Sequence, residues 1–189
     1  SSDVCSSDLS IPQDKDIYRT ISRGVPGTSM PAWGGALSDD EIRGVVQYIK
    51  TFSKRFASEK PRKPITIGSV PATTSESVEK GEKLYREMRC ARCHGSDLMG
   101  DGPIAGELYD IWDHRVFIYD LTDPNTYKFG FDKKDLFLIF TTGIDGTPMK
   151  SYNHLTDAER WDLASFIESE IEKEKYKPAQ YEIDLTTYS

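Results

Sequence analysis

The sequence lacks any long apolar segment and any excess of positive charge. Its longest strongly apolar run, Leu136–Phe140, spans five residues, whereas a helix that crosses a bilayer needs about 20. The formal net charge of the 189 residues is -7 at pH 7, and unspecific binding to nucleic acid needs a basic surface. The sequence therefore predicts no membrane span in this chain and no nucleic-acid partner.

Cysteine and histidine are scarce, with three of each. An odd number of cysteines excludes a complete disulfide framework. A zinc site built on the neighbouring pair Cys90 and Cys93 would need two more ligands at a matching spacing, and neither Cys5 nor the remaining histidines supply them. A thioredoxin-like redox pair would need a βαβ pattern around it, which the sequence does not show. The pair therefore needs another explanation.

The two neighbouring cysteines stand in the motif Cys90-Ala91-Arg92-Cys93-His94. The spacing C-x-x-C-H is the attachment signature of c-type haem. Both thiols form thioether bonds with the haem vinyl groups, and the adjacent histidine becomes the proximal ligand of the iron. We therefore expect haem c to be bound covalently here.

An electron-transfer haem usually has methionine or histidine as its second axial ligand. We favour Met149, because its loop, residues 143–149, contains two glycines and a proline that allow close approach to a flat cofactor. Met99 follows the attachment motif too closely to reach the other face of a haem. His114 is the main alternative, and we expect His154 in an exposed loop.

Two amphipathic helices are predicted around these residues. Apolar residues at spacings of three and four predict a helix over Glu76–Met88, with a capping box that starts at Thr73. A closing helix is predicted after the capping box Thr156–Glu159. Glycine in a helix interior costs about 1 kcal/mol relative to alanine, so we expect another helix to cross closely at Gly81, with Tyr85 beside the crossing.

The sequence also contains an internal repeat. Residues 16–30 align with residues 135–149 at a constant offset of 119, with their glycines and methionines in register. Met30 thereby corresponds to the loop methionine described above. After a one-residue gap, Leu37–Glu41 matches Leu155–Glu159, which predicts a second capping box and a second closing helix.

Together these features resemble a class I cytochrome c domain. The resemblance covers residues 75–176 and rests on the glycine and tyrosine of the first helix, the attachment motif, the loop methionine and the closing helix. It implies an all-α fold in which helices surround a covalently bound haem. Lys150 departs from the family pattern, because proline often follows the ligand methionine there.

The resemblance assigns roles to two further residues. The stretch Gly100–Pro103 is similar to one common in bacterial periplasmic members of the family. It implies that the Pro103 carbonyl accepts a hydrogen bond from His94 Nδ1, which would fix the tautomer of the ring. Asp120–Thr122 followed by Tyr127 also recurs in such domains, and implies a contact between Tyr127 and a haem propionate.

The repeat and the resemblance divide the chain into five expected segments. They are a leader foreign to the protein (1–10), the C-terminal half of a first cytochrome c domain (11–57), a proline-rich linker (58–74), a complete cytochrome c domain (75–176) and a tail (177–189). No attachment motif surrounds Cys5, so we expect one covalent haem in this chain and two in the intact protein, with Met30 as a ligand of the first. The alternative for the leader is an unusual serine-rich N-terminus.

The resemblance implies an electron carrier rather than an enzyme. With His94 and Met149 at both axial positions, the iron would shuttle between Fe(III) and Fe(II) with no position open for a substrate. The chain would act alone or as the cytochrome subunit of a larger oxidoreductase. A haem enzyme of the peroxidase or nitrogen-oxide reductase kind is the alternative, and it would need an open axial site with acid–base groups beside it. A sensor in which the methionine dissociates ranks lowest.

Charge and family together suggest partners and location. Residues 61–189 hold 23 acidic and 16 basic side chains, whereas residues 1–60 hold eight of each. The acidic second part predicts redox partner proteins with a basic docking face. Haem c is attached outside the cytoplasmic membrane, so the resemblance implies a periplasmic location or another one outside that membrane.

Overall fold

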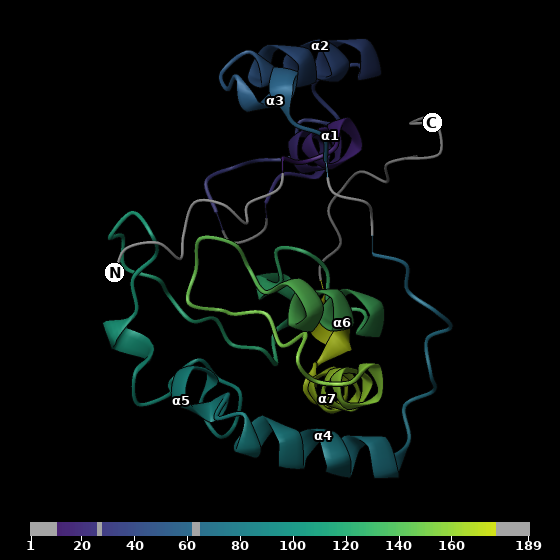
Figure 1. Cartoon of the computed structure of the whole chain (residues 1–189), viewed down its shortest axis with the longest axis vertical. Helices are drawn as coiled ribbons and strands as arrows, with labels where there is room; N and C mark the ends of the chain where they lie inside the picture. Colours follow the sequence, from purple (N-terminus) through teal and green to yellow (C-terminus); the bar gives the residue numbers. More distant parts are fainter. Residues whose placement is uncertain (1–10, 26–27, 62–64, 177–189) are drawn as a thin grey trace. The chain divides into compact units, whose positions relative to one another are not determined.

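The computed structural model of the chain describes residues 11–25, 28–61 and 65–176 (Figure 1). These described residues are helical and contain no β-strand. None of the described helices is long and apolar enough to cross a membrane. The expected leader and tail lie outside the described residues.

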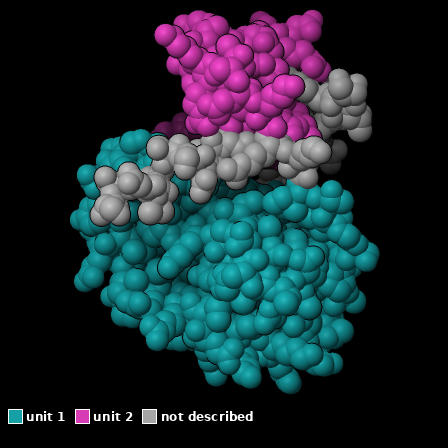
Figure 2. All heavy atoms as spheres, in the orientation of Figure 1, with its two compact units in different colours: residues 1–5, 65–176 teal, residues 6–64, 177–189 magenta. Residues whose placement is uncertain are grey.

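The described residues form two compact units, one up to residue 61 and one from Ile65 to Tyr176 (Figure 2). The division falls inside the segment predicted as a linker, while the domain boundaries themselves stay predictions. In the larger unit, four α-helices and three short 3-10 helices follow one another. They are α4 (Ser75–Glu87), α5 (Ala91–His94), η1 (Ala105–Glu107), η2 (Pro124–Thr126), α6 (Lys133–Thr142), α7 (Asp157–Glu170) and η3 (Lys173–Lys175).

Helix α4 begins one residue later than its predicted capping box implies. The cap is Thr74, whose Oγ1 accepts a hydrogen bond from Ser77 N at 3.1 Å. The predicted cap at Thr73 is wrong, because the Thr73 hydroxyl is turned to α7 and donates to Glu168 Oε2 at 2.7 Å. Thr74 is left in the extended conformation that an N-cap requires.

The close helix crossing predicted at Gly81 is confirmed, and its partner is α7. A Cβ atom on Gly81 would lie 2.1 Å from the carbonyl oxygen of Asp162 and 2.7 Å from Phe166 Cβ. The ring of Tyr85 meets that of Phe166 edge to face, with centroids 5.5 Å apart. In Figure 1, α7 is seen end-on with α4 running beside it. Glycine is therefore the residue that lets the two helix backbones touch.

The crossing helices and α6 enclose one hydrophobic core. Its buried members are Tyr85, Leu98, Leu136, Phe140, Leu155, Leu163, Ala164, Phe166, Ile167 and Ile171. Burial of these apolar side chains removes their surface from water, and this is the main favourable contribution to the free energy of folding.

The smaller unit repeats part of the larger one. Its helices are α1 (Asp14–Arg23), α2 (Asp39–Lys50) and the short α3 (Arg55–Ser58). The bounds of α1 correspond to those of α6 at the 119-residue offset of the sequence repeat. The capping boxes predicted at Ser38 and Thr156 are both present. The core of this unit contains Tyr18, Ile21, Ile42 and Val46.

The two methionine loops also have matching hydrogen bonds. Val25 N donates to Met30 O at 3.1 Å, and Ile144 N donates to Met149 O at 2.9 Å. In each loop the methionine N–H donates to a threonine hydroxyl at 3.2 Å. The glycine that follows each first helix has a positive φ, 68° and 70°, a conformation open to glycine at little cost. The internal repeat of the sequence is therefore also a repeat of structure.

Candidate haem site

The attachment motif forms one tight helical turn directly after α4. Arg89 has a φ of 59°, and this left-handed residue turns the chain away from the helix. Cys90 caps α5, and its carbonyl accepts hydrogen bonds from Cys93 N and His94 N at 3.1 and 3.0 Å. Both thiols are free and half-buried. The turn thus gathers two thiols and an imidazole within five residues of sequence.

His94 carries the clearest electrostatic signature of the site. Burial lowers the pKa of its imidazole to about 4, so the ring is neutral near pH 7, which is the form that binds metals. Its Nδ1 is buried without a hydrogen-bond partner in the described part of the chain. The hydrogen bond expected from the family resemblance, to the carbonyl of Pro103, is therefore not formed in this structure, and a role for Pro103 stays a prediction.

The segment after the motif packs directly onto α5 and fixes it. Gly100 N donates to His94 O at 2.9 Å, and Gly102 N donates to Cys93 O at 3.2 Å. A Cβ atom on Gly102 would lie 2.3 Å from the carbonyl oxygen of Arg92, so only glycine allows this approach. From α4, the Tyr85 hydroxyl donates to the Gly95 carbonyl at 2.6 Å. Burial raises the pKa of Tyr85, so the hydroxyl keeps the proton that it donates.

Cys90 joins the motif to the segment that follows the Met149 loop. The phenol group of Tyr152 lies close enough to the Cys90 thiol for the two groups to influence each other electrostatically. Burial raises the pKa of the Cys90 thiol to about 11 and that of Tyr152 to about 12. Cys90, Met149 and Tyr152 all pack against the same hydrophobic core. The fold therefore brings together two predicted site residues that are 59 positions apart in the sequence.

The Met149 loop is held from two sides. Toward the helix, Tyr152 N donates to Phe140 O in α6 at 2.7 Å, and a Cβ atom on Gly143 would lie 2.8 Å from Met149 O. On the other side, Ile111 N donates to the carbonyl of Gly146 at 3.0 Å. These contacts fix the backbone of the loop without using the methionine sulfur.

The other candidate ligands lie away from this core. The side chain of His114 is 79% exposed, and its Nδ1 lies 3.5 Å from Asp110 Oδ2. Met99 and His154 are also exposed. This placement favours Met149 over His114 as a second ligand. Met30 packs, half-buried, against the core of the smaller unit.

Tyr127 donates its hydroxyl to the carbonyl of Leu121 at 2.7 Å. Burial raises its pKa, so the hydroxyl stays protonated and able to donate. Its predicted contact with a haem propionate stays a prediction.

Sequence reasoning missed two residues beside the site. No sequence pattern predicts that the side chain of Tyr152 lies beside Cys90. Arg160 belongs to no motif that the sequence analysis singles out, yet it is buried. The repeat held a signal, because the residue at the equivalent position is Ile42.

The residues present fit haem c. Two free thiols and a buried neutral imidazole stand in a C-x-x-C-H turn, and a thioether sulfur belongs to the same core. The neutral imidazole is the form that ligates a metal.

Comparison with known proteins gives the family. The Cytochrome c family matches residues 78–170, and the family described as cytochrome c oxidase, cbb3-type, subunit III matches residues 5–49. The chain is 26% identical over 167 residues to the Cbb3-type cytochrome c oxidase subunit CcoP of Helicobacter pylori (strain 52). That match covers 83% of this chain and 46% of the relative, so it spans less than half of the relative's length.

A solved structure supports the same conclusion. The chain superposes on one chain of the reducing HAO-like protein complex of Kuenenia stuttgartiensis with a TM-score of 0.81 and 37% identity. The match covers 86% of this chain and 74% of that one. The predicted all-α cytochrome fold and the predicted haem c are thereby confirmed. The chain belongs to the c-type cytochromes, with a cytochrome c domain that binds haem covalently and a partial second copy before it.

Proposed function

We propose that the chain carries electrons through a haem c that Cys90 and Cys93 attach and that His94 and Met149 ligate, as the cytochrome subunit of a larger redox complex. Haem c, when bound, supplies a one-electron couple between Fe(III) and Fe(II). The observation that carries the proposal is the shared core, in which the attachment turn and the Met149 loop meet through Tyr152. The membership in a family of electron-transfer cytochromes supports it.

The protein's own residues hold the geometry of the site fixed. Segment 100–104 is hydrogen-bonded to the backbone of α5, and from α4 the Tyr85 hydroxyl donates to the Gly95 carbonyl at the end of the turn. The methionine loop is tied to α6 and to the hairpin around residues 109–115. A site that changes little on oxidation and reduction suits electron transfer. If His94 and Met149 both held the iron, no position on it would be left for a substrate, and the chain would make and break no substrate bonds.

The methionine loop of the smaller unit supports a second haem site in the intact protein. Its hydrogen bonds match those of the Met149 loop, and Met30 takes the ligand's place. The match of residues 5–49 to a cytochrome oxidase subunit family agrees with this assignment. We expect Met30 to ligate a first haem there, in a protein with two haems.

A haem enzyme of the peroxidase or nitrogen-oxide reductase kind is the second candidate. The observation in its favour is the structural similarity to a chain of a reducing HAO-like complex. Such an enzyme would need an axial position that opens and acid–base groups beside it. Asp145 carries the carboxyl group and His154 the imidazole nearest to Met149 in sequence, and both side chains are exposed.

The partners proposed are redox proteins with a basic docking face. The larger unit is acidic, and opposite charge speeds encounter between redox partners. Its hairpin carries the exposed apolar side chains Tyr109, Ile111 and Trp112 next to the methionine loop, and exposed apolar groups of this kind are typical of contact surfaces. Attachment of haem c supports a location in the periplasm or otherwise outside the cytoplasmic membrane.

The test is the absorption spectrum of the oxidised protein with haem attached. A weak band at the red end of the spectrum reports an iron–sulfur bond to methionine, and we expect it in the unaltered chain. Met149→Ala should remove the band and lower the reduction potential, because methionine ligation raises it. Met99→Ala, at an exposed methionine, is the matched control and should leave the band intact.

Two other outcomes would count against the proposal. Loss of the band in His114→Ala, with Met149→Ala unaffected, would show that the ligand assignment is wrong. A high-spin spectrum without the band in the unaltered chain would favour the haem enzyme.

A further inference from the structure

We propose that Arg160 is a positioning residue for Met149. Through Thr141 and Ser151 it holds the segment that carries the sulfur ligand, and so it strengthens the bond between that sulfur and the iron. The inference rests on the proposed ligation by Met149. It adds a residue that determines how readily Met149 is displaced from the iron.

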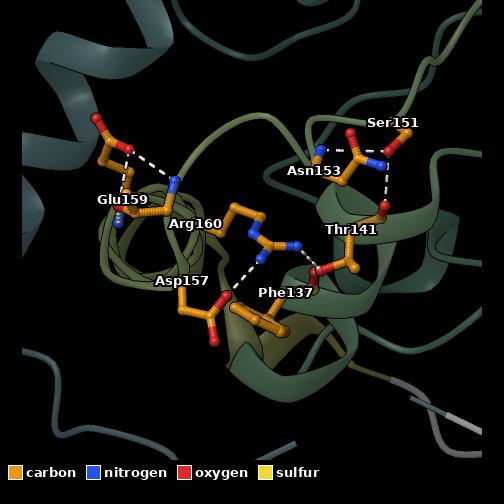
Figure 3. Close-up of polar contacts among 8 residues, drawn as sticks. Phe137, Thr141, Ser151, Asn153, Asp157, Glu159 and Arg160 are labelled. Carbon is orange, nitrogen blue, oxygen red and sulfur yellow. Dashed lines mark hydrogen bonds and ion pairs between the residues drawn. The ribbon is translucent and has the colours of Figure 1, made fainter. Parts of the chain in front are cut away.

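Arg160 lies in the first turn of α7 and is only 7% exposed. Its Nη1 donates to Thr141 Oγ1 at 2.6 Å, and its Nη2 donates to Asp157 Oδ1 at 2.5 Å (Figure 3). The guanidinium carbon lies 4.9 Å from the centroid of the Phe137 ring, within the range of a cation–π contact. Arg160 therefore ties α7 to the last turns of α6.

The last turn of α6 in turn anchors the chain after the ligand. Ser151 Oγ donates to the Thr141 carbonyl at 2.7 Å and accepts from Asn153 N at 3.2 Å (Figure 3). The Thr141 hydroxyl donates to Phe137 O at 2.7 Å, which orients its lone pairs for the arginine. A continuous series of hydrogen bonds thus runs from Arg160 to a residue two positions after Met149.

The internal repeat shows that packing alone does not require this arginine. The equivalent residue in α2 is Ile42, which is 1% exposed. Ser22 and Ala32 stand at the positions of Thr141 and Ser151. The same helix–loop–helix therefore forms with an apolar side chain at the position of the arginine and no hydroxyl at that of Ser151.

Burial of Arg160 is also costly. Its Nε is buried without a hydrogen-bond partner in the described residues. Removing a charge from water costs several kcal/mol, and replacing a buried ion pair by apolar residues is often neutral or stabilising. A stabilising role alone is therefore a weak explanation for this side chain, whereas a positioning role explains both the burial and the direction of its donors.

A firm anchor has a direct consequence for the ligand. Dissociation of the methionine requires its loop to open locally, and local opening is easier where anchoring hydrogen bonds are missing. A preorganised loop also loses less entropy when its sulfur binds. Any added molecule that competes with Met149 for the iron should therefore bind more tightly when the anchor is removed.

The experiment uses the full chain with haem attached and imidazole as the competing ligand. We expect Arg160→Ile to raise the affinity of the oxidised protein for imidazole about tenfold and Ser151→Ala about fivefold, as expected for the loss of single hydrogen bonds. Both substitutions install the residue that the first repeat has at the equivalent position, Ile42 and Ala32. Arg86→Ile, at an arginine whose side chain is 74% exposed on α4, is the matched control and should not change the affinity.

A double variant separates positioning from simple stabilisation. In the smaller unit, the Tyr18 hydroxyl donates to Asp39 Oδ1 at 2.7 Å, at the positions of Phe137 and Asp157. Arg160→Ile combined with Phe137→Tyr should therefore restore a tie between α6 and α7, and part of the thermal stability, while the imidazole affinity stays raised. If the double variant restores the affinity as well, Arg160 only staples the helices and the proposal fails.

The same series distinguishes this inference from the proposed ligation. If Met149→Ala raises imidazole affinity and neither Arg160→Ile nor Ser151→Ala does, ligation stands and positioning is overturned. If Met149→Ala has no effect, the proposed ligation itself is wrong. Should Arg160→Ile fail to fold, Ser151→Ala decides, because it removes only the last hydrogen bond of the series.

Discussion

Two helix–loop–helix segments of this chain share their local structure and differ in what covers them. In the larger unit, α4 crosses α7 at Gly81 and leaves Phe166 only 7% exposed. In α2, the residue equivalent to Phe166 is Tyr48, which is 64% exposed. In the repeat, Gly44 of α2 is equivalent to Asp162, the residue of α7 at the crossing point. A Cβ atom on Gly44 would meet no described atom within 4 Å. Local sequence thus suffices for two helices, one capping box and a shaped loop, whereas the more extensive core of the larger unit also requires α4.

The cores differ accordingly. The larger unit buries a continuous cluster of ten side chains, most of them from α4, α6 and α7, whereas the core of the smaller unit has four buried side chains from α1 and α2. Because hydrophobic stabilisation follows the apolar area buried, we expect local opening to cost less free energy in the smaller unit. Hydrogen exchange resolved by peptide can measure both units in the same full-length protein.

The largest effect is expected at the covered aromatic residue. Phe166→Ala should lower the stability of the larger unit by about 3–5 kcal/mol, because it leaves a cavity beneath α4. Tyr48→Ala should change the stability of the smaller unit by no more than about 0.5 kcal/mol, as at other exposed positions. Faster exchange in α4 and α7 for Phe166→Ala is the measurement. A large loss for Tyr48→Ala would mean that α2 is covered in solution.

A smaller effect with opposite signs is expected at the paired glycines. Gly81→Ala should destabilise by about 1–3 kcal/mol, because its Cβ would overlap the backbone of α7 and force the helices apart. Gly44→Ala should stabilise α2 by about 0.5–1 kcal/mol, since alanine is the better helix former where space is open. Urea denaturation with exchange in each unit checks both. Equal signs would contradict the difference in coverage.

The parts of this structure that the sequence predicts are those with local causes. The caps at Ser38 and Thr156, the turn of the attachment motif and the register of the two methionine loops follow from short patterns with a clear physical meaning. The crossing at Gly81 was also predictable, because glycine within a helix needs a reason. Each of these features is decided within a few residues of sequence.

The parts that escape prediction depend on contacts between distant residues. The cap of α4 moves from Thr73 to Thr74 because Glu168, far along the chain, takes the Thr73 hydroxyl. Arg160 is buried because Thr141 and Asp157 supply acceptors and a phenylalanine ring supplies a stacking surface. No helical periodicity distinguishes such an arginine from one that faces solvent. Only its alignment with Ile42 in the repeat hinted at burial.

The smallest differences are expected at the capping boxes, which the two units share. Ser38→Ala and Thr156→Ala should each cost about 1 kcal/mol in the helix that they cap. The two hydroxyls accept hydrogen bonds from Glu41 N and Glu159 N at 3.4 and 3.3 Å. Equal losses, measured by hydrogen exchange in α2 and α7, would show that caps act locally whatever covers the helix. A clearly larger loss in α7 would show coupling between the cap and the α4 crossing.

The carboxylates of these boxes give the same comparison a pH dependence. Hydrogen bonds from the cap side chain, and then from the cap backbone, lower the pKa of Glu41 and of Glu159. A carboxylate with a lowered pKa in the folded state stabilises the fold at pH values above its ordinary pKa, and that contribution is lost as the pH falls through the pKa of the folded state.

NMR titration of the side-chain carboxyl signals should therefore find both pKa values below the ordinary one for glutamate. Ser38→Ala and Thr156→Ala should return both pKa values toward the ordinary one, because the hydrogen bond from the cap hydroxyl, the main cause of the shift, disappears. If only the Glu159 value shifts back, the cap of α2 is not formed in solution, and the likeness between the two units ends at their loops.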